Sequence, residues 1–478
     1  MTTQIPGHTK VAVIGGGPAG SLAAALMARE NIQVTLFERD KFPRYHIGES
    51  LLTSLMPLLD FAGVLEKVRS HGFIPKPGAY FKVKDEGEAG YLDFSRLSRY
   101  RHSYEVIRSE FDKILLDHAA ESGAAVFEET RVSAIRFTQD KQPEALDWVR
   151  GNESGTTAFD FLVDASGLNG LLSAKYLNNR KFQEHFANVA IGNYWRNYSS
   201  YKPEQPGVFF LEVIKGGLGW TWTIPLHSGE LSVGVVIHRD TFVKWKKECN
   251  NDLNAVYMRG VQGCPAIMKM LEGAHISKTV EAWSDYSYVA EKFSDPGYRL
   301  AGDAAGFIDP FFSTGVHMAG LGALSSAATI CAVIRGDVEE TEACKFHEQC
   351  IRRSYNRLML TVGGFYKQMR NQNEAKGLDQ TGVQTMLTEL QPIISGNIDL
   401  NDSELNKNAI EKAMDILGRI GHDAHDPEGS SVSKLIVQSM ASGNLERTTG
   451  AINGLSIRWE RGQLGLTRKR SAVEPDMS

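Results

Sequence analysis

Apolar runs and a glycine-rich turn alternate at the start of the chain. Residues 10–14 are apolar after Lys10, residues 15–20 contain four glycines, residues 21–30 have a helical pattern, and residues 33–38 have the pattern of a second strand, with Val34, Leu36 and Phe37. Short continuous apolar runs are typical of strands buried on both faces, and a strand–helix–strand order is typical of a parallel sheet. We therefore expect this segment to form a parallel β–α–β unit.

The pattern predicts further elements of the same kind along the chain. A second helix is expected from Leu51 and another over residues 109–122, where apolar side chains recur at helical spacing. Residues 161–164 and residues 298–301 are short apolar runs, each followed by a turn that contains glycine. We expect both runs to be buried strands of the parallel sheet.

Between residues 187 and 295 the pattern changes to longer alternating strands, for example at residues 208–214, 220–225 and 231–238. This change predicts an antiparallel sheet inserted between two parts of the parallel fold. After about residue 350 the chain is expected to be helical and polar, and the last ten residues or so are expected to be disordered.

Residues 310–334 contain no Asp, Glu, Lys or Arg, a stretch long enough to cross a bilayer. The stretch also contains His317, several Ser and Thr residues and three glycines, which favour a buried, closely packed helix. The N-terminus lacks an apolar signal core, and the C-terminus carries no anchor or sorting motif. We expect a cytoplasmic protein without a membrane span.

Composition and charge narrow the class of protein further. The length of 478 residues predicts two or three core-forming units, and 42% hydrophobic with 23% charged residues excludes global disorder and coiled coils. The formal net charge of −5 gives no electrostatic footprint for nucleic acid. The five cysteines form no Cys-x-x-Cys pair, so neither a disulfide framework nor a metal site is expected.

The turn at residues 15–20 fits the pattern G-x-G-x-x-G between a predicted strand and a predicted helix. In this pattern the first glycine allows the tight turn, the second lets the backbone approach a pyrophosphate, and the third packs helix on strand. Glu38 ends the next strand, where an acidic side chain binds ribose hydroxyls. The residues expected to bind the dinucleotide here are Gly15, Gly16, Gly17, Ala19, Gly20 and Glu38.

Two distant segments favour FAD over NAD as the dinucleotide. Residues 299–306 place Gly-Asp after a strand, which resembles the flavoprotein segment whose aspartate, here Asp303, reaches the ribityl chain. Arg108 begins a segment that resembles the R-x-x-F-D motif of flavin monooxygenases, in which the arginine contacts the cofactor. No second glycine-rich fingerprint for NADPH is present, although related hydroxylases bind NADPH without one.

Two further segments carry a more specific resemblance. Residues 219–225, Gly-Trp-Thr-Trp-Thr-Ile-Pro, match the W-x-W-x-I-P motif of flavin-dependent halogenases. Trp220 and Trp222 point the same way on a strand, and their bulk is expected to separate the flavin from the organic substrate. Residues 72–79 resemble the halogenase segment with a single essential lysine, which corresponds to Lys76. The nearby Lys82 and Lys84 are expected to be solvated surface residues.

Residues 311–317, Phe-Phe-Ser-Thr-Gly-Val-His, resemble the halide-binding turn of the same family, which assigns the halide to Ser313, Thr314 and Gly315. In that turn, backbone amides at a helix N-terminus receive an anion beside the flavin. Residues 42–50 resemble the strap that covers the flavin. The resemblance thus adds Arg44, Glu49 and Val316 to the residues expected to bind the cofactor.

The resemblance extends from about residue 8 to residue 350 and is strongest to fungal and bacterial halogenases of phenolic and polyketide rings. It implies an α/β fold with a Rossmann-like FAD-binding domain of the aromatic monooxygenase type. The expected divisions are 8–186 and 296–350 for the FAD-binding domain, 187–295 for the inserted substrate-binding sheet, and 351–478 for a helical C-terminal region.

The resemblance also implies a reaction. FADH2 from a separate flavin reductase reacts with O2 to give a C4a-hydroperoxide, which oxidises chloride or bromide to the hypohalous acid. Lys76 then holds the oxidant, either as a haloamine or by hydrogen bonding, and the sequence does not choose between them. Electrophilic substitution on a secondary-metabolite ring follows.

Phe312 suggests the class of substrate. Tryptophan halogenases have a glutamate directly before the Ser-Thr-Gly of the halide turn, and this chain has Phe312 there. Without that carboxylate the ring must be activated largely by its own substituents, as a phenol is. We therefore expect a small hydroxylated aromatic substrate, unless another carboxylate such as Glu49 substitutes for the missing one.

Three alternatives remain open at this point. A single-component FAD hydroxylase would use NADPH directly and would not need a lysine at position 76. A prenyl-chain reductase of the same fold carries a similar aromatic-proline segment. A flavin-binding scaffold without turnover would not require the full set of site motifs.

Overall fold

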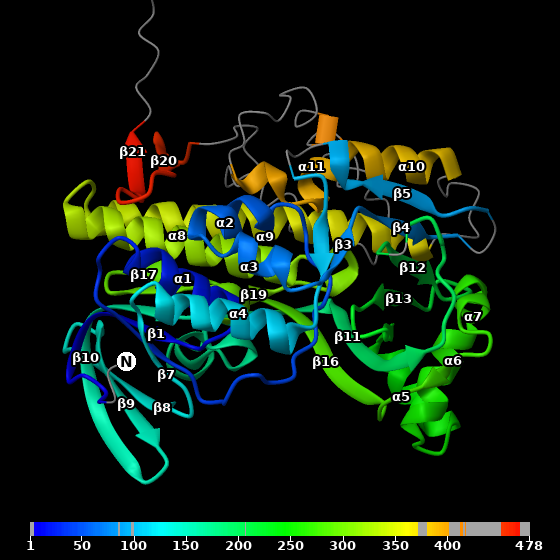
Figure 1. The fold of residues 1–478 in the computed structure, drawn as a ribbon, viewed down its shortest axis with the longest axis horizontal. Coiled ribbons are helices and arrows are strands. Elements are labelled where there is room, and N and C mark those ends of the chain that lie inside the picture. The colour runs from blue at the N-terminus through cyan, green and yellow to red at the C-terminus, as the bar shows by residue number, and fades with distance from the viewer. Residues whose placement is uncertain are drawn as a thin grey trace, which may run out of the picture.

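The computed structural model contains two large β-sheets with helices along their common edge (Figure 1). The structure describes residues 4–84, 87–96, 100–205, 207–370, 380–400 and 451–468, together with residues 412, 413 and 416. The expectation of disorder in the last ten residues concerns residues outside the described part of the chain. None of the five cysteines forms a disulfide.

The first sheet is built on parallel strands, as the apolar runs of the sequence predicted. β1 lies at its centre between β10 and β2, and all three run parallel. The order β18–β10–β1–β2–β7 is parallel throughout. The strands of this sheet are β1 (His8–Ile14), β2 (Val34–Phe37), β7 (Ala125–Phe127), β8 (Arg131–Phe137), β9 (Pro143–Arg150), β10 (Glu153–Asp164), β17 (Ser294–Asp295) and β18 (Tyr298–Leu300).

The second sheet is antiparallel except for one parallel pair, β12 with β4. It includes β4 and β5, which precede the expected insertion at residues 187–295, so this sheet is formed by more than one segment of the chain. Its strands are β4 (Gly78–Lys82), β5 (Gly90–Asp93), β11 (Arg180–Arg196), β12 (Phe209–Val213), β13 (Gly219–Pro225), β14 (Leu231–His238), β15 (His275–Ile276), β16 (Glu281–Ala290) and β19 (Gly306–Phe307). The domain boundaries given by the sequence stay a prediction.

Two long helices, α8 and α9, pack against each other, and both contact the edge of the first sheet that is formed by β17 and β18 (Figure 1). α8 is long and apolar enough to cross a membrane by length and composition, but 89% of its most apolar window is buried inside the protein. The helices are α1 (Pro18–Ala28), α2 (Leu55–Ala62), α3 (Leu65–Ser70), α4 (Arg108–Glu121), α5 (Arg239–Glu248), α6 (Leu253–Gln262), α7 (Pro265–Met270), α8 (Gly315–Arg335), α9 (Glu340–Arg370), α10 (Gln380–Glu389) and α11 (Gln391–Ile394).

The region after residue 350 is neither wholly polar nor wholly helical. α9 buries Tyr355, Leu358 and Phe365 in the core that it shares with the second sheet. Two short strands, β20 (Leu455–Arg458) and β21 (Gly465–Arg468), form an antiparallel pair. The described part of the C-terminal region is therefore part of the packed structure.

The predicted second helix begins later than the sequence indicated. The pattern placed its start at Leu51, but α2 begins at Leu55. The reason is that residues 49–51 pair with β6 (Ser103–Glu105): the Leu51 amide donates to the carbonyl oxygen of Tyr104 at 3.1 Å. β6 also pairs with β3 (Ile74–Lys76), so β6 lies between two segments from earlier in the chain.

Candidate active site

The glycine-rich turn between β1 and α1 is shaped by close backbone contacts. Gly15 has φ +101°, and a Cβ at this position would lie 2.3 Å from the carbonyl oxygen of Ala165. A Cβ at Gly20 would lie 1.9 Å from the carbonyl oxygen of Gly15. Only glycine fits at both positions. The turn leads directly into α1, whose first-turn amides are suited to hold phosphate oxygens.

Glu38 lies beside this turn. Its carboxylate accepts hydrogen bonds from the amides of Gly16 at 2.6 Å and Asp40 at 2.7 Å. Gly17 precedes α1, and Ala19 is buried in the first turn of the helix. The structure therefore brings together the six residues that the sequence assigned to a dinucleotide.

Arg108 holds the segment that the sequence identified as a strap over the cofactor. Its guanidinium donates to the carbonyl oxygens of Ile47 at 2.9 Å and Gly48 at 3.3 Å, and it pairs with Asp112 at 2.8 Å. Arg44 of the strap pairs with the same Asp112 carboxylate at 3.0 Å. One buried carboxylate thus joins the strap to α4.

Asp303 and Val316 come from a distant part of the chain. Asp303 follows β18, and burial raises the pKa of its carboxyl to about 6 although Arg108 and Arg180 act in the opposite direction. No residue of the described chain donates a hydrogen bond to this carboxylate, so its oxygens are available to polar groups of a ligand. Val316 is buried in the first turn of α8. These residues, with the turn and the strap, fit a flavin dinucleotide.

Lys76 is almost completely buried, with 1% of its surface exposed. Its ammonium donates hydrogen bonds to the hydroxyl of Ser50 at 2.6 Å and to the carbonyl oxygen of Leu51 at 3.2 Å. The rings of Phe94 and Phe209 lie 5.0 and 5.1 Å from the ammonium nitrogen. Burial lowers the pKa of Lys76 to about 8, although Glu105 raises it.

Glu105 is the buried carboxylate next to this lysine. The Ser50 hydroxyl donates to one of its oxygens at 3.3 Å, and its other oxygen has no hydrogen-bond partner in the described chain. Burial raises the pKa of Glu105 to about 8, and the Lys76 ammonium opposes this shift. The three residues form a chain, lysine–serine–glutamate, that is closed off from solvent.

Glu49 lies on the other side of the strap and faces the second sheet. Its carboxylate accepts a hydrogen bond from the Tyr194 hydroxyl at 2.7 Å. Burial raises the pKa of Glu49, which Ser232 and Tyr194 oppose through hydrogen bonds. Glu49 is thus in contact with β11 and β14.

The turn before α8 presents unpaired donors. Ser313 adopts a left-handed conformation with φ +59°, and α8 begins two residues later at Gly315. No described residue accepts a hydrogen bond from the amides of Thr314, Gly315 or Val316. A Cβ placed on Gly315 would meet no atom within 4 Å, so there is open space beside these amides. The turn can therefore receive an anion.

Trp220 and Trp222 lie side by side on β13, with ring centroids 5.9 Å apart. The Trp220 indole donates to the hydroxyl of Tyr366 on α9 at 2.8 Å, and this hydroxyl donates to Asp309 at 2.8 Å. The Trp222 indole donates to Ser232 at 3.2 Å. Each indole is therefore held in one orientation by its nitrogen.

Aromatic rings connect the lysine to the anion-binding turn. Phe209, beside Lys76, contacts Phe81 with ring centroids 6.1 Å apart, and Phe81 contacts Phe312 at 5.5 Å. Phe311 in turn contacts Trp220 at 5.3 Å. The aromatic motif, the lysine and the turn before α8 thus belong to one packed region.

The chain is similar to known proteins over most of its length. A family model described as an FAD binding domain matches residues 8–358. Flavin-dependent halogenase armH2 of Armillaria mellea is 37% identical over 98% of this chain and 100% of its own length. Sulochrin halogenase gedL of Aspergillus terreus is 38% identical over 98% of this chain and 95% of its own length. The chain belongs to the flavin-dependent halogenases.

Solved structures of the same family share the fold. The myxobacterial chondrochloren halogenase CndH has a TM-score of 0.75 and 25% identity, over 97% of this chain and 100% of that one. The halogenase CmlS has a TM-score of 0.74 and 27% identity, over 97% of this chain and 84% of that one. The predictions of a Rossmann-like FAD-binding fold and of a halogenase are confirmed.

The structure of this halogenase also shows contacts that the sequence analysis missed. Ser50 and Glu105 were not identified as partners of Lys76, and Tyr366 was not identified as the partner of Trp220. Glu105 lies in the short strand Ser-Tyr-Glu, and nothing in that local sequence set it apart. No local pattern pointed to Tyr366.

One expectation about the neighbouring lysines is wrong. Lys82 is not solvated, because its ammonium lies 3.0 Å from the carboxylate of Glu212 and its side chain is only 14% exposed. Lys82 lies on β4 in the second sheet, next to β12, which carries Glu212. Lys76 is therefore buried and Lys82 is partly buried, and the two differ in their partners.

Proposed function

We propose that this halogenase attaches chlorine or bromine to an electron-rich phenolic ring, and that Lys76 presents the oxidised halide to that ring. The observation that carries this proposal is the burial of the Lys76 ammonium among Ser50, Glu105 and two phenylalanine rings. The Lys76 ammonium makes hydrogen bonds to Ser50 and Leu51 rather than a salt bridge that fixes the fold. Its charge is instead available to a small polar reagent.

When bound, reduced FAD would supply two of the four electrons that reduce O2 to water, and the halide would supply the other two as it is oxidised. The overall reaction balances as FADH2 + O2 + Cl⁻ + H⁺ + ArH → FAD + ArCl + 2 H2O. The chain's own contribution is to place the halide, to keep the substrate apart from the flavin, and to hold the oxidised halogen. The binding of FAD by the glycine-rich turn, Glu38, the strap and Asp303 belongs to this proposal.

The pKa of Lys76 makes two modes of action available. With a pKa of about 8, roughly a tenth of the amine is neutral at pH 7 and half at pH 8. The ammonium form donates a hydrogen bond that polarises a hypohalous acid, and the neutral amine forms a haloamine with loss of water. Ser50 and Glu105 are suited to both modes, because they take up or return a proton next to the nitrogen.

The halide is assigned to the amides of Thr314 and Gly315, with Ser313 shaping the turn. These donors are unpaired at the N-terminus of a helix of 21 residues, where the helix dipole favours an anion. Trp220 and Trp222 form the partition between flavin and substrate. Because both indoles are held by hydrogen bonds, the partition is rigid.

Phe312 supports a phenol as the substrate. Its side chain is buried and packs on Phe81 and Phe365, so this position offers no carboxylate to the reacting ring. The buried carboxyl next to Lys76, that of Glu105, has a pKa raised to about 8, which makes it a weak source of negative charge at neutral pH. A phenol activates its own ortho and para carbons and therefore does not depend on a carboxylate of the protein.

A separate flavin reductase is the proposed partner, because the chain has no second nucleotide fingerprint. Purified protein with FAD and NADPH but no reductase is expected to consume NADPH only at background. Rapid NADPH consumption stimulated by substrate would instead support a single-component hydroxylase. The cytoplasmic location stays a prediction.

The deciding experiment measures products by mass spectrometry with a flavin reductase, NADH, FAD and chloride. The panel contains resorcinol-type phenols, their O-methyl ethers, sulochrin and free tryptophan. We expect a chloride-dependent mass gain on free phenols, slower turnover of the ethers, and none on tryptophan. Lys76→Met is expected to lose this product while retaining flavin, and Lys84→Ala serves as the matched control. Tryptophan reacting faster than every phenol would overturn the assignment.

A further inference from the structure

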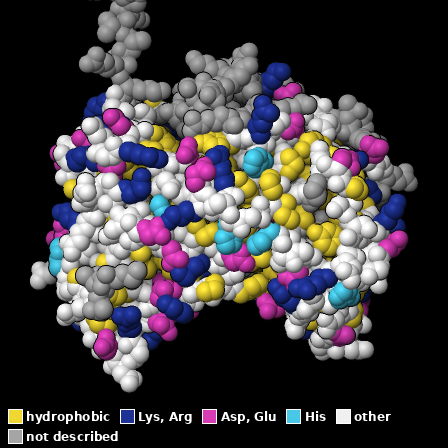
Figure 2. Space-filling model, in the orientation of Figure 1, with side chains coloured by type: hydrophobic (Ala, Val, Ile, Leu, Met, Phe, Trp, Pro, Cys, Tyr) yellow, Lys and Arg dark blue, Asp and Glu magenta, His cyan; other side chains and the backbone are white. Residues whose placement is uncertain are grey.

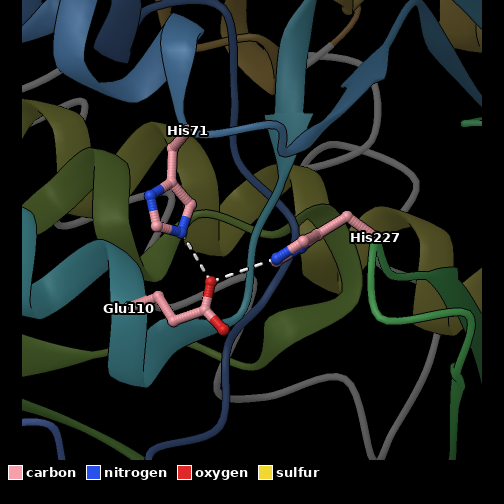
Figure 3. Close-up of side chains that lie close together, drawn as sticks. All are labelled: His71, Glu110 and His227. Carbon is pink, nitrogen blue, oxygen red and sulfur yellow. Dashed lines mark hydrogen bonds and ion pairs between the residues drawn. The ribbon is translucent and has the colours of Figure 1, made fainter.

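Three side chains from separate segments meet at the surface of the molecule (Figure 3). His71 follows α3, Glu110 lies in the first turn of α4, and His227 lies between β13 and β14. Both imidazoles point their Nε2 atoms at the same oxygen of Glu110, at 2.6 Å from His71 and 3.1 Å from His227. The halogenation chemistry described above uses none of the three.

The donor set is that of a zinc site. Zn²⁺ prefers imidazole nitrogen and carboxylate oxygen, and His2Glu is a known set of three protein ligands. One ligand atom from each residue lies within 4.8 Å of the other two. For zinc bonds of about 2.05 Å, tetrahedral ligand atoms are roughly 3.3 Å apart. The two nitrogen–oxygen distances would therefore widen by less than about 1 Å.

A buried aromatic ring packs against the two imidazole rings, and the other side of the cluster is open to solvent. Phe73, which is buried, packs against His71 at 4.5 Å and against His227 at 5.3 Å between ring centroids. The side chains of His71, Glu110 and His227 are 33%, 35% and 24% exposed, so a water molecule can reach the cluster as a fourth ligand. Figure 2 shows histidine and acidic side chains together near the middle of this face.

We propose that His71, Glu110 and His227 form a binding site for Zn²⁺ or a divalent cation of similar preference. No metal site was expected from the spacing of the cysteines, and these three ligands lie 39 and 117 residues apart in the sequence. The site has a structural role. The ion joins the segment that leads into β3 and Lys76, the helix that begins with Arg108, and the turn that follows the two tryptophans.

The site makes zinc a stabilising ligand of the folded chain. Since the unfolded chain does not hold the three ligands together, zinc stabilises the folded state by mass action. The affinity falls as the pH falls, because a protonated imidazole cannot bind a metal. This inference does not depend on the proposed substrate or on the role of Lys76.

The test uses full-length protein, treated with a chelator and dialysed, and titrated with ZnCl2 by calorimetry. We expect one zinc ion per chain and a thermal midpoint that rises with zinc. The variants His71→Gln and His227→Gln should each weaken zinc binding at least tenfold and remove the rise in midpoint. His275→Gln, at an exposed position on β15, is the matched control and should bind zinc as the wild type does.

Cobalt identifies the ligands directly. Co²⁺ bound by two imidazoles and a carboxylate gives visible d–d bands without the intense ultraviolet charge-transfer band of a cobalt–thiolate bond. A thiolate band would show that the metal binds the free cysteines, and it would overturn the proposal. The absence of zinc binding by the wild type, or equal binding by the double variant of His71 and His227, would overturn it as well.

Discussion

The ammonium of Lys76 donates a hydrogen bond of 2.6 Å to the hydroxyl of Ser50. This contact exists because residues 49–51 and β3 flank β6 on its two sides. The same hydroxyl donates to Glu105, so a single serine connects a buried base to a buried acid. The chemistry proposed for Lys76 depends on this connection, and so do two of the predictions that follow.

Ser50→Ala is expected to lower halogenation at least tenfold while leaving the flavin content unchanged. The substitution removes one of the two hydrogen bonds of the Lys76 ammonium and separates it from Glu105. Loss of a partner by a buried charged group is costly, so the variant should also lower the pKa of Lys76. Steady-state rates over a range of pH measure both effects. An unchanged rate and pH profile would contradict the role of Ser50.

Glu105→Gln is expected to move the titration of Lys76 to lower pH. The Glu105 carboxylate raises the pKa of Lys76, so its neutral replacement leaves burial unopposed and the pKa falls below about 8. In the wild type the two residues interact and titrate as a pair, whereas the variant should show one titration. The pH dependence of kcat reports the shift, whichever protonation state of Lys76 is active. Glu121→Gln, on the exposed end of α4, is the control.

Lys76→Met is expected to stabilise the fold at neutral pH, even though it removes activity. Burial lowers the pKa of Lys76 from 10.5 to about 8, so the unfolded chain binds more protons between these pH values. The stability of the wild type should therefore rise with pH in this window, and that of the variant should not. The difference in free energy of unfolding between the variant and the wild type should fall by an amount on the order of 3 kcal/mol between pH 7 and pH 10.5. Denaturant unfolding at several pH values measures it, and a constant difference would refute the burial of the charge.

Tyr366→Phe is expected to lower the free energy of unfolding by about 1–3 kcal/mol, because the buried indole nitrogen of Trp220 loses its acceptor. The partition should then loosen, and less halogenated product should form per FADH2 consumed. Tyr355→Phe is the matched control on the same helix. The hydroxyl of Tyr355 is buried without a hydrogen-bond partner in the described chain, so its removal should cost nothing. Equal effects of the two variants would argue against the role of Tyr366.

Gly315→Ala is expected to fold normally but to raise the KM for halide. A Cβ at this position meets no protein atom within 4 Å and the residue begins a helix, so alanine is tolerated by the chain itself. The methyl group would occupy the space that the proposed halide needs. Halide-dependent rates for chloride and for the larger bromide measure the effect, which should be greater for bromide. A bromide soak should also place anomalous density at the amides of Thr314 and Gly315.

The sequence was sufficient to predict a structural feature where that feature depends on residues close together in the chain. Gly15 and Gly20 are required by close contacts with the backbone at Ala165 and at Gly15, so the spacing of the glycines identified the turn. The start of α2 was misplaced, because strand pairing with β6 overrode the local helical pattern at Leu51.

Contacts between distant strands could not be read from local pattern. Lys82 carries the same charge as an exposed lysine, and only the pairing of β4 with β12 brings it to Glu212. The set of Ser50, Lys76 and Glu105 likewise results from the pairing of β3 and the strap with β6. The hydrophobic period of a strand shows which face is buried but not which strand lies beside it.

α9 has a consequence for attempts to recombine halogenases. Its first half contacts the FAD-binding part, where His347 bonds the carbonyl oxygen of Leu300, and its second half carries Tyr366 against Trp220. A chimera with a crossover between residues 320 and 370 would combine a tryptophan from one parent with a helix from the other. Such a hybrid requires that the tryptophan, its tyrosine and Asp309 be inherited from the same parent. Swapping the C-terminal quarter as an independent unit would therefore change substrate coupling.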